Sequence, residues 1–261
     1  MRSTIEPGRR AAMLAIAGML LIPADRIIAA DSPGAPPDAD ATALVLKADE
    51  VRFPAAGFEA SVTIESSGDG DAVTLRKYRV LSKGNENTVV MVTEPAAERG
   101  QILLMKGRDL WVFLPSVSQP VRLSLSQRLT GQVANGDLAR ANFAGDYDAR
   151  ILRTEEIDGK PAYVLELVAR ERGVTYHRVV YWVRKDNAWP IKAEFYALSD
   201  RLLKSARYED FQRAAGAVRP MRIVMHDALH ADERSTLQYS DMKLRDLPDR
   251  IFTKDYLKRL E

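Results

Sequence analysis

Residues 99–115, RGQILLMKGRDLWVFLP, contain two short apolar runs on either side of a turn. The runs are Ile102–Met105 and 110–114, and Gly107 and Arg108 lie between them. Two such runs joined by a glycine-containing turn are typical of a β-hairpin. Because both runs are apolar at every position, each strand is expected to bury both of its faces. The sheet that holds them therefore needs a cover on both sides.

Outward from this hairpin, the chain continues as strands. Residues 58–65 alternate apolar and polar side chains, which is the period of a half-buried strand. The other expected strands are 72–83, 88–94, 121–129, 147–157, 162–169, 175–185, 191–198, 202–210, 221–227 and 236–244. A long series of antiparallel strands with few helices predicts a mainly β protein. One large curved sheet or barrel fits them better than a sandwich of short strands.

Three segments depart from the strand pattern. Residues 41–51 carry apolar side chains at helical spacing, and Thr253 is placed to cap a terminal helix over residues 254–260. Residues 130–146, TGQVANGDLARANFAGD, are too long for an ordinary hairpin loop and include a short helix candidate at 137–141. Loops of this length are often functional, and the glycines are candidate hinges; an ordinary surface excursion is the alternative.

The first thirty residues have the pattern of an export signal. Arg2, Arg9 and Arg10 precede the apolar run 11–22, which would make about 18 Å of helix, too short to span a bilayer. With the small residues 29–30, this predicts a cleavable signal peptide over 1–30 and a periplasmic location; a buried N-terminal helix is the alternative. Residues 31–40, DSPGAPPDAD, are expected to form a flexible Pro-rich tail, and residues 41–261 a single domain.

Composition excludes several kinds of chemistry. The chain has no cysteine, which rules out disulfides, thiolate zinc sites, iron–sulfur clusters and a cysteine nucleophile. The predicted signal carries four basic and two acidic side chains, so the rest of the chain has equal numbers of both. A neutral chain without a basic run offers no binding surface for nucleic acid.

No catalytic constellation is recognisable. His226 and His230 end a predicted strand, where a spacing of four residues is about 13 Å, too far apart to share a metal ion. Neither a nucleophile elbow nor a dinucleotide or phosphate-binding glycine motif is present. We therefore expect a binding protein or carrier, with no cofactor and no metal, rather than an enzyme. A sheet with few helices to fill it suggests an apolar cavity, while a core plugged by the helix 41–51 is equally compatible with the composition.

The central stretch resembles the outer membrane lipoprotein-sorting family, the relatives of the periplasmic carrier LolA and its acceptor LolB. The resemblance rests on motifs that occur in the family's order and spacing: RGQILLMKGRDLWVFLP (99–115), EVRFP (50–54), GDYDARIL (145–152), YWVRKDNAWPIKAEFYALSDRLLKSARYEDF (181–211) and IFTKDYLKRL (251–260). It implies an unclosed antiparallel half-barrel lidded by helices, here residues 41–51 and 130–146.

The resemblance also leads to an expected function for the chain. It implies a periplasmic carrier or binder of lipid or acylated lipoprotein cargo, with an inner-membrane transporter complex and an outer-membrane acceptor as possible partners. Two alternatives share the fold: a periplasmic regulator that senses envelope stress, and an accessory protein of an inner-membrane efflux-type exporter. The candidate lining residues, which are large apolar or aromatic side chains, are Leu104, Met105, Trp111, Phe113, Leu125, Phe143, Leu165, Trp182, Phe195 and Tyr208.

Overall fold

The computed structural model describes residues 38–68, 73–140, 142–230 and 232–257. The predicted signal peptide, and the predicted tail except its last three residues, lie outside the described residues.

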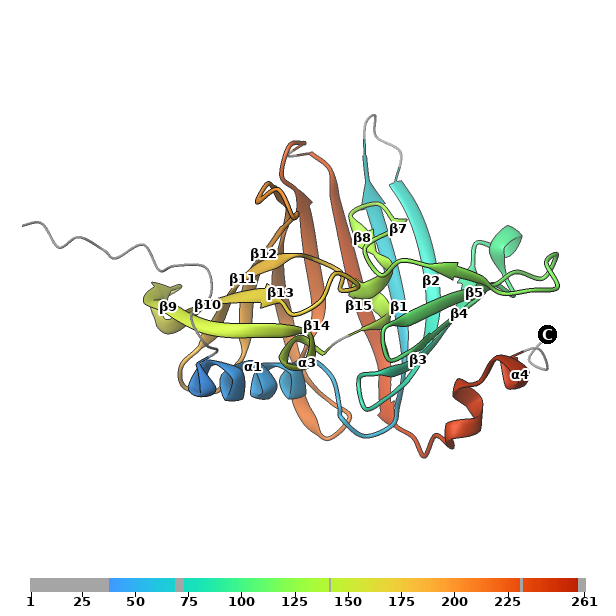
Figure 1. Cartoon of the computed structure of the whole chain (residues 1–261), viewed down its shortest axis with the longest axis horizontal. Coiled ribbons are helices and arrows are strands. Elements are labelled where there is room, and N and C mark those ends of the chain that lie inside the picture. The colour runs from blue at the N-terminus through green and yellow to red at the C-terminus, as the bar shows by residue number, and fades with distance from the viewer. Residues whose placement is uncertain (1–37, 69–72, 141, 231, 258–261) are drawn as a thin grey trace, which may run out of the picture. The chain divides into compact units, whose positions relative to one another are not determined.

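Most of the described chain forms one antiparallel sheet of thirteen strands that is not closed into a barrel (Figure 1). Its strands are β1 (Phe58–Ser67), β2 (Val73–Lys83), β3 (Asn87–Glu94), β4 (Ile102–Lys106), β5 (Asp109–Phe113), β6 (Val121–Leu123), β9 (Tyr147–Ile157), β10 (Lys160–Ala169), β11 (Arg178–Arg184), β12 (Pro190–Tyr196), β13 (Leu202–Ala214), β14 (Ala217–Asp227) and β15 (Arg234–Leu244). Neighbours in sequence pair as hairpins, and β1 also pairs with β15. The predicted fold class is confirmed.

This topology leaves β6 and β9 as the two edges of the sheet. Since they follow one another among the strands of that sheet, the chain between them has to cross from one edge to the other. We call residues 124–140 and 142–146 the cover segment. It contains β7 (Arg128–Thr130), β8 (Val133–Ala134), α2 (Asn135–Ala139) and α3 (Phe143–Asp146), drawn in green and yellow-green in Figure 1.

The cover segment begins earlier than the sequence suggested. The expected strand 121–129 is wrong: it is broken after Leu123, and β7 pairs only with β8 in a separate two-stranded sheet. Leu125 is buried, with 2% of its surface exposed, and it packs into the main apolar cluster. Its carbonyl accepts a hydrogen bond from the Gly136 N–H of α2 at 2.9 Å, so the backbone here pairs with the cover segment and not with β5.

Helix α1 (Ala39–Arg52) forms the second part of the cover. Asp38 caps it by accepting a hydrogen bond from the Asp40 N–H at 2.9 Å, so the helix starts two residues before the predicted position. Ala41, Val45 and Ala48 are fully buried, and α1 contacts α3, β9 and β14.

The C-terminal segment covers the opposite face of the sheet. Two short helices, η2 (Asp249–Phe252) and α4 (Lys254–Leu257), follow β15, and η2 contacts β3 and β4; the remaining short helix is η1 (Ala96–Glu98). The last residues of the predicted terminal helix, 258–260, lie outside the described residues. Within the described ranges, none of the helices combines the length and the apolar character needed to cross a bilayer.

The β4–β5 hairpin shows how one stretch serves both faces. Met105 pairs with Leu110, and both belong to the large cluster that packs against α1 and the cover segment, on the face we call inner. Leu104 pairs with Trp111 on the outer face, in a second cluster that includes Phe252 of η2. Both faces are apolar because both are covered, as the sequence predicted.

Candidate functional site

The inner face of the sheet and its two covers enclose one continuous apolar cluster. The cover segment contributes apolar side chains that are nine-tenths or more buried: Leu125, Val133, Leu138, Ala139 and Phe143. They contact sheet residues such as Leu165 and Tyr181, which have no exposed surface. In this conformation the interior is therefore filled by the protein's own side chains, and a large part of that filling belongs to the cover.

The ten predicted lining residues do not form one surface. Six belong to the inner cluster: Met105, Leu125, Phe143, Leu165, Phe195 and Tyr208. Leu104, Trp111 and Phe113 lie on the outer face under the C-terminal segment, where the Lys254 ammonium is 4.0 Å from the centroid of the Trp111 ring. Trp182 packs with Val164 and Val180 in a third cluster on the outer face of β10 and β11.

A buried ion pair joins α1 to this interior. Asp49 and Arg52 are 2% and 6% exposed, and their charged groups are 2.5 Å apart. Arg52 lies over the Phe143 ring at 3.9 Å, and Asp49 Oδ2 accepts a hydrogen bond from the Ala144 N–H at 2.8 Å. Burial raises the pKa of the Asp49 carboxyl to about 6, although the Arg52 charge opposes that shift. The pair connects α1 to α3 of the cover segment.

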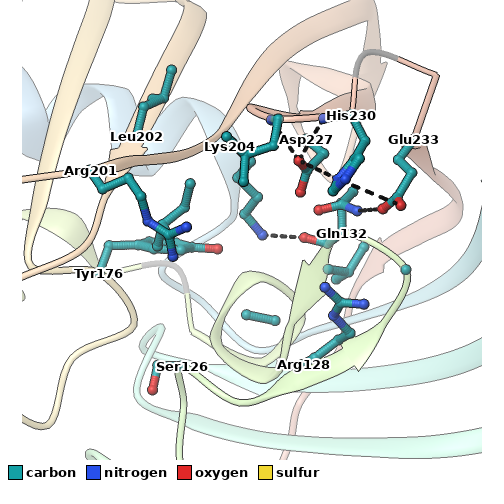
Figure 2. A pocket seen from close by; sticks show the side chains of 15 residues that line it. Ser126, Arg128, Gln132, Tyr176, Arg201, Leu202, Lys204, Asp227, His230 and Glu233 are labelled. Atoms are coloured by element: carbon teal, nitrogen blue, oxygen red, sulfur yellow. Dashed lines mark hydrogen bonds and ion pairs between the residues drawn. The ribbon is translucent and has the colours of Figure 1, made fainter.

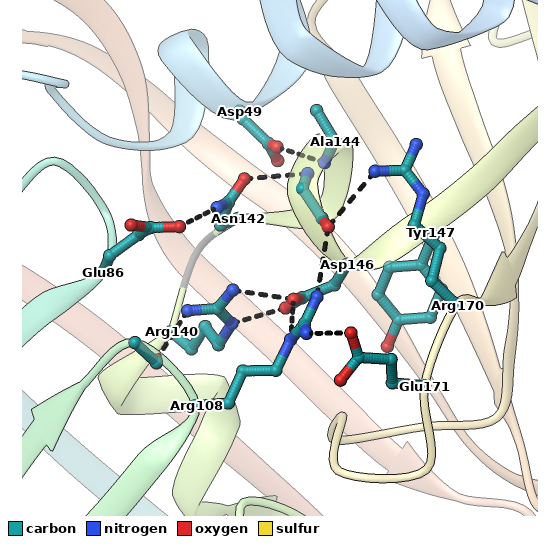
Figure 3. Close-up of polar contacts among 12 residues, drawn as sticks. Asp49, Glu86, Arg108, Arg140, Asn142, Ala144, Asp146, Tyr147, Arg170 and Glu171 are labelled. Carbon is teal, nitrogen blue, oxygen red and sulfur yellow. Dashed lines mark hydrogen bonds and ion pairs between the residues drawn. The ribbon is translucent and has the colours of Figure 1, made fainter.

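A second buried ionic group fixes the α3 end of the cover segment (Figure 3). Arg140 reaches Asp146 with two nitrogens, one of them 2.6 Å from Oδ1, and donates to the Gly107 carbonyl at 2.7 Å. Arg108, in the β4–β5 turn, donates to the same carboxylate at 3.1 Å. The cover segment is thus attached to the end of the β4–β5 hairpin by charged hydrogen bonds.

A third ionic group fixes the α2 end. Lys204 of β13, which is 5% exposed, lies 2.7 Å from Asp137 Oδ2 of α2 and also donates to the Gln132 carbonyl. The Tyr176 hydroxyl donates to the same carboxylate at 2.8 Å, and burial, with the Asp137 charge, raises the pKa of Tyr176 well above its usual value. The cover segment therefore has two ionic attachments, one at α2 and one at α3.

Two glycines allow the cover segment to approach the sheet closely. At Gly131, where φ is +49°, a Cβ would overlap the Ser66 and Ser235 hydroxyls of β1 and β15. At Gly136 it would overlap the Thr175 side chain. These contacts give the two glycines a docking role, which the sequence interpretation as hinges did not include.

An open pocket of about 380 Å³ lies where the β7–β8 hairpin meets the strand ends of β13 and β14 (Figure 2). The residues that line it are Ser126, Arg128, Gly131, Gln132, Val133, Ala134, Tyr176, Arg201, Leu202, Leu203, Lys204, Asp227, Leu229, His230 and Glu233. Three of them, Asp227, His230 and Glu233, bring possible metal-ligand atoms within 4.8 Å of one another. The sequence interpretation paired His230 with His226 instead, because the turn that brings these three together is not visible in strand spacing.

Sequence reasoning missed the ionic attachments entirely. Lys204 and Asp137 are 67 residues apart, and each looks like an ordinary solvated charge in its local pattern. A faint signal existed at Lys204, which falls on the apolar side of the alternation in β13 between Leu202 and Ala206. A charge at an inward position requires a partner.

Comparison with known proteins identifies the fold independently. A family model with the description "Uncharacterized protein" matches residues 84–259. A LolA superfamily protein from Nitrosomonas europaea is 62% identical, with a TM-score of 0.79; the match covers 83% of this chain and 98% of that one. None of the curated proteins matches the chain.

Two more distant structures share the fold. A DUF1329 family protein from Desulfovibrio piger is 22% identical with a TM-score of 0.74, covering 85% of this chain and all of that one (100%). A putative outer membrane lipoprotein-sorting protein domain from Vibrio parahaemolyticus is 19% identical with a TM-score of 0.72, covering 84% and 99%. These matches, with the 62% identical relative, agree with the resemblance found in the sequence motifs.

Proposed function

This chain belongs to the LolA superfamily, and we propose that it is a periplasmic carrier of lipid or acylated cargo whose cover segment opens to admit an acyl chain. It would be exported by the signal at residues 1–30 and would act as a single domain over 41–261, without catalysis. An inner-membrane transporter complex and an outer-membrane acceptor are its proposed partners.

The observation that carries this proposal is the composition of the closed interior. The cover segment places Leu125, Val133, Leu138 and Phe143 against the apolar inner face of the sheet. When the cover moves away, that face loses its apolar filling and becomes a surface that an acyl chain can occupy. The chain would then replace the cover's side chains instead of entering a preformed void.

The energetics of this exchange are favourable for an acyl chain. Each buried methylene contributes about 0.8 kcal/mol, so a dozen supply on the order of 10 kcal/mol before the cost of opening. Opening breaks the ionic attachments of the cover, which hydration of the separated charges partly compensates. It also exposes the cover's apolar side chains to water, and the acyl chain has to offset that cost by burying its own methylenes. The inner members of the predicted lining set, Met105, Leu165, Phe195 and Tyr208, are the sheet residues we propose as contacts.

A reversible crosslink tests whether the cover controls uptake. An ideal Cβ on Gly136 lies 3.0 Å from the Thr175 Cβ, slightly less than the ~3.5–4.5 Å that separates the Cβ atoms of a disulfide. The chain has no cysteine of its own, so the double variant Gly136→Cys/Thr175→Cys can form only one disulfide within a molecule, and the oxidised monomer is the form to be tested.

We expect the oxidised variant to take up the fluorescent fatty acid cis-parinaric acid at least ten times more weakly than the same protein after reduction. Reduction of one sample provides the matched control. Equal uptake by both forms would overturn the role of the cover. Absence of uptake in the wild type and the reduced variant, together with native mass spectra of the periplasmic protein free of lipid mass, would overturn the carrier function itself.

A further inference from the structure

The pocket beside the β7–β8 hairpin contains two cationic side chains without partners. The guanidinium groups of Arg128 in β7 and of Arg201, just before β13, form no hydrogen bond or ion pair with any of the residues described here. Figure 2 shows their guanidinium groups pointing into the pocket from two sides. Arg178 of β11, in contrast, is paired with Asp200 at 2.5 Å.

The other polar groups of the pocket are already satisfied by one another. Lys204 is neutralised by Asp137, and Gln132 Nε2 donates to Glu233 Oε2 at 2.7 Å. Asp227 Oδ1 accepts from the backbone N–H groups of Leu229 at 2.7 Å and His230 at 3.1 Å. Asp227 is therefore held within its own loop, and Glu233 is bound to Gln132 of the cover segment. Neither carboxylate is paired with Arg128 or Arg201, so the two guanidinium groups remain available for a ligand.

The remaining wall of the pocket is apolar and leads toward the interior. Leu202, Leu203 and Leu229 line it, and Leu229 is 68% exposed. Val133 and Tyr176 line the pocket and also belong to the inner cluster, where the Tyr176 ring lies 4.4 Å from that of Phe195. A ligand whose charged group lies between the arginines would thus have its apolar part beside the covered interior.

We propose that this pocket binds the phosphate group of an anionic amphiphile, with Arg128 and Arg201 as its ligands. The planar guanidinium fork matches the oxygens of a phosphate, and the pair supplies one fork from the cover segment and one from the sheet. This inference deepens the proposed carrier function: the interior takes the acyl chain and the pocket takes the headgroup.

The test compares soluble probes that carry the phosphate group and the acyl chains together, the acyl chains alone, or the phosphate alone. Dihexanoylphosphatidic acid, uncharged dihexanoylglycerol and inorganic phosphate are titrated by calorimetry into the wild type, Arg128→Gln, Arg201→Gln and the double variant. Arg213→Gln is the matched control, because Arg213 is exposed at the other end of β13 and has no charged partner among the described residues. Substitution of exposed arginines leaves the fold intact.

We expect the double variant to bind the phosphatidic acid at least tenfold more weakly than the wild type, and each single variant to show part of that loss. Binding of dihexanoylglycerol should not change, and Arg213→Gln should match the wild type for every probe. The wild-type affinity for the phosphatidic acid should fall as salt is raised, because the contact is ionic.

Three results would overturn the inference in distinguishable ways. Equal affinity of the double variant and the wild type for the phosphatidic acid would exclude the arginines as ligands, while leaving the carrier function standing if dihexanoylglycerol binds. Inorganic phosphate bound as tightly as the lipid would assign the pocket to a free oxyanion. Failure of both lipids to bind any form would count against the carrier function, and the phosphate titration would then decide on the pocket separately.

Discussion

The sheet and its cover segment are held in place by different interactions. Each sheet strand is hydrogen-bonded to its neighbours along its length and buries residues such as Leu165 and Val179 completely. The cover segment has only a short two-stranded ladder of its own. It is held on the sheet by apolar side chains in the inner cluster and by the ionic groups around Asp137 and Asp146, without a backbone ladder to the main sheet. Charged groups can be rehydrated when they separate, so the cover can open at a lower cost than any strand can leave the sheet.

We expect the largest loss of stability from a variant that breaks one ionic attachment of the cover segment. Lys204→Met leaves the Asp137 carboxylate buried beside Tyr176 without its cation, which costs about 3–5 kcal/mol for a buried pair. The cover should detach at its α2 end while the sheet persists. Limited proteolysis should therefore cleave within residues 124–140, and circular dichroism should still report the β-sheet.

Matched variants show whether the ion pair is responsible. Lys204→Met/Asp137→Leu removes both charges and should restore protease resistance. Lys77→Met breaks a pair with Glu94 whose side chains are both 44% exposed, and it should change stability by less than about 1 kcal/mol. If Lys204→Met remained as resistant to the protease as the wild type, the ion pair would not be what holds the cover segment on the sheet.

The sheet should respond differently to a cavity in its apolar face. Leu165 is fully buried on β10, so Leu165→Ala should lower the free energy of unfolding by about 2–5 kcal/mol. Urea denaturation should show one shifted transition, with no new protease site in the cover. Val168→Ala, on the same strand at a side chain 38% exposed, should cost under about 0.5 kcal/mol. If Leu165→Ala instead opened only the cover segment and left the urea transition unchanged, the sheet and the cover would not respond separately as we expect.

The difference between the sheet and the cover segment also explains which features could be predicted from the sequence. Local patterns predicted most of the strands and α1, because alternation and helical spacing are set within a few residues. They could not tell the inner face of β5 from the outer one, since Trp111 and Leu110 are both apolar and alternate equally well. That choice depends on which cover packs where, and Trp111 faces the C-terminal segment.

The ionic attachments and the pocket were beyond prediction for a related reason. They join side chains that are distant in sequence, such as Arg140 with the Gly107 carbonyl and Lys204 with Asp137. Family resemblance supplied the architecture but not these pairs. Only the three-dimensional path of the cover segment, from the edge of β6 to that of β9, brings them together.

We expect the smallest change in the free energy of unfolding from the titration of Asp49, which lies at the contact between α1 and α3. The pKa of Asp49 is about 6 in the folded protein and 3.8 in its ordinary environment, because burial penalises the carboxylate. Between pH 4 and 6 the folded protein therefore holds a proton that the unfolded chain has lost. It follows that the stability from this group is greatest below pH 4, declines as the pH rises to 6, and is absent above that; the total change is at most about 3 kcal/mol.

Asp49→Asn isolates this contribution, since the amide oxygen can still accept the Ala144 N–H but does not titrate. Subtracting its free energy of unfolding from that of the wild type at each pH removes the titrations common to both proteins. As the pH rises from 4 to 6, the wild type should lose stability relative to Asp49→Asn. Above pH 6 the difference between the two free energies of unfolding should stay constant. A difference that is flat across this range would mean that the Arg52 charge fully offsets the burial of Asp49. The carboxylate would then stay ionised in the folded protein, and the contact between α1 and α3 would be independent of pH.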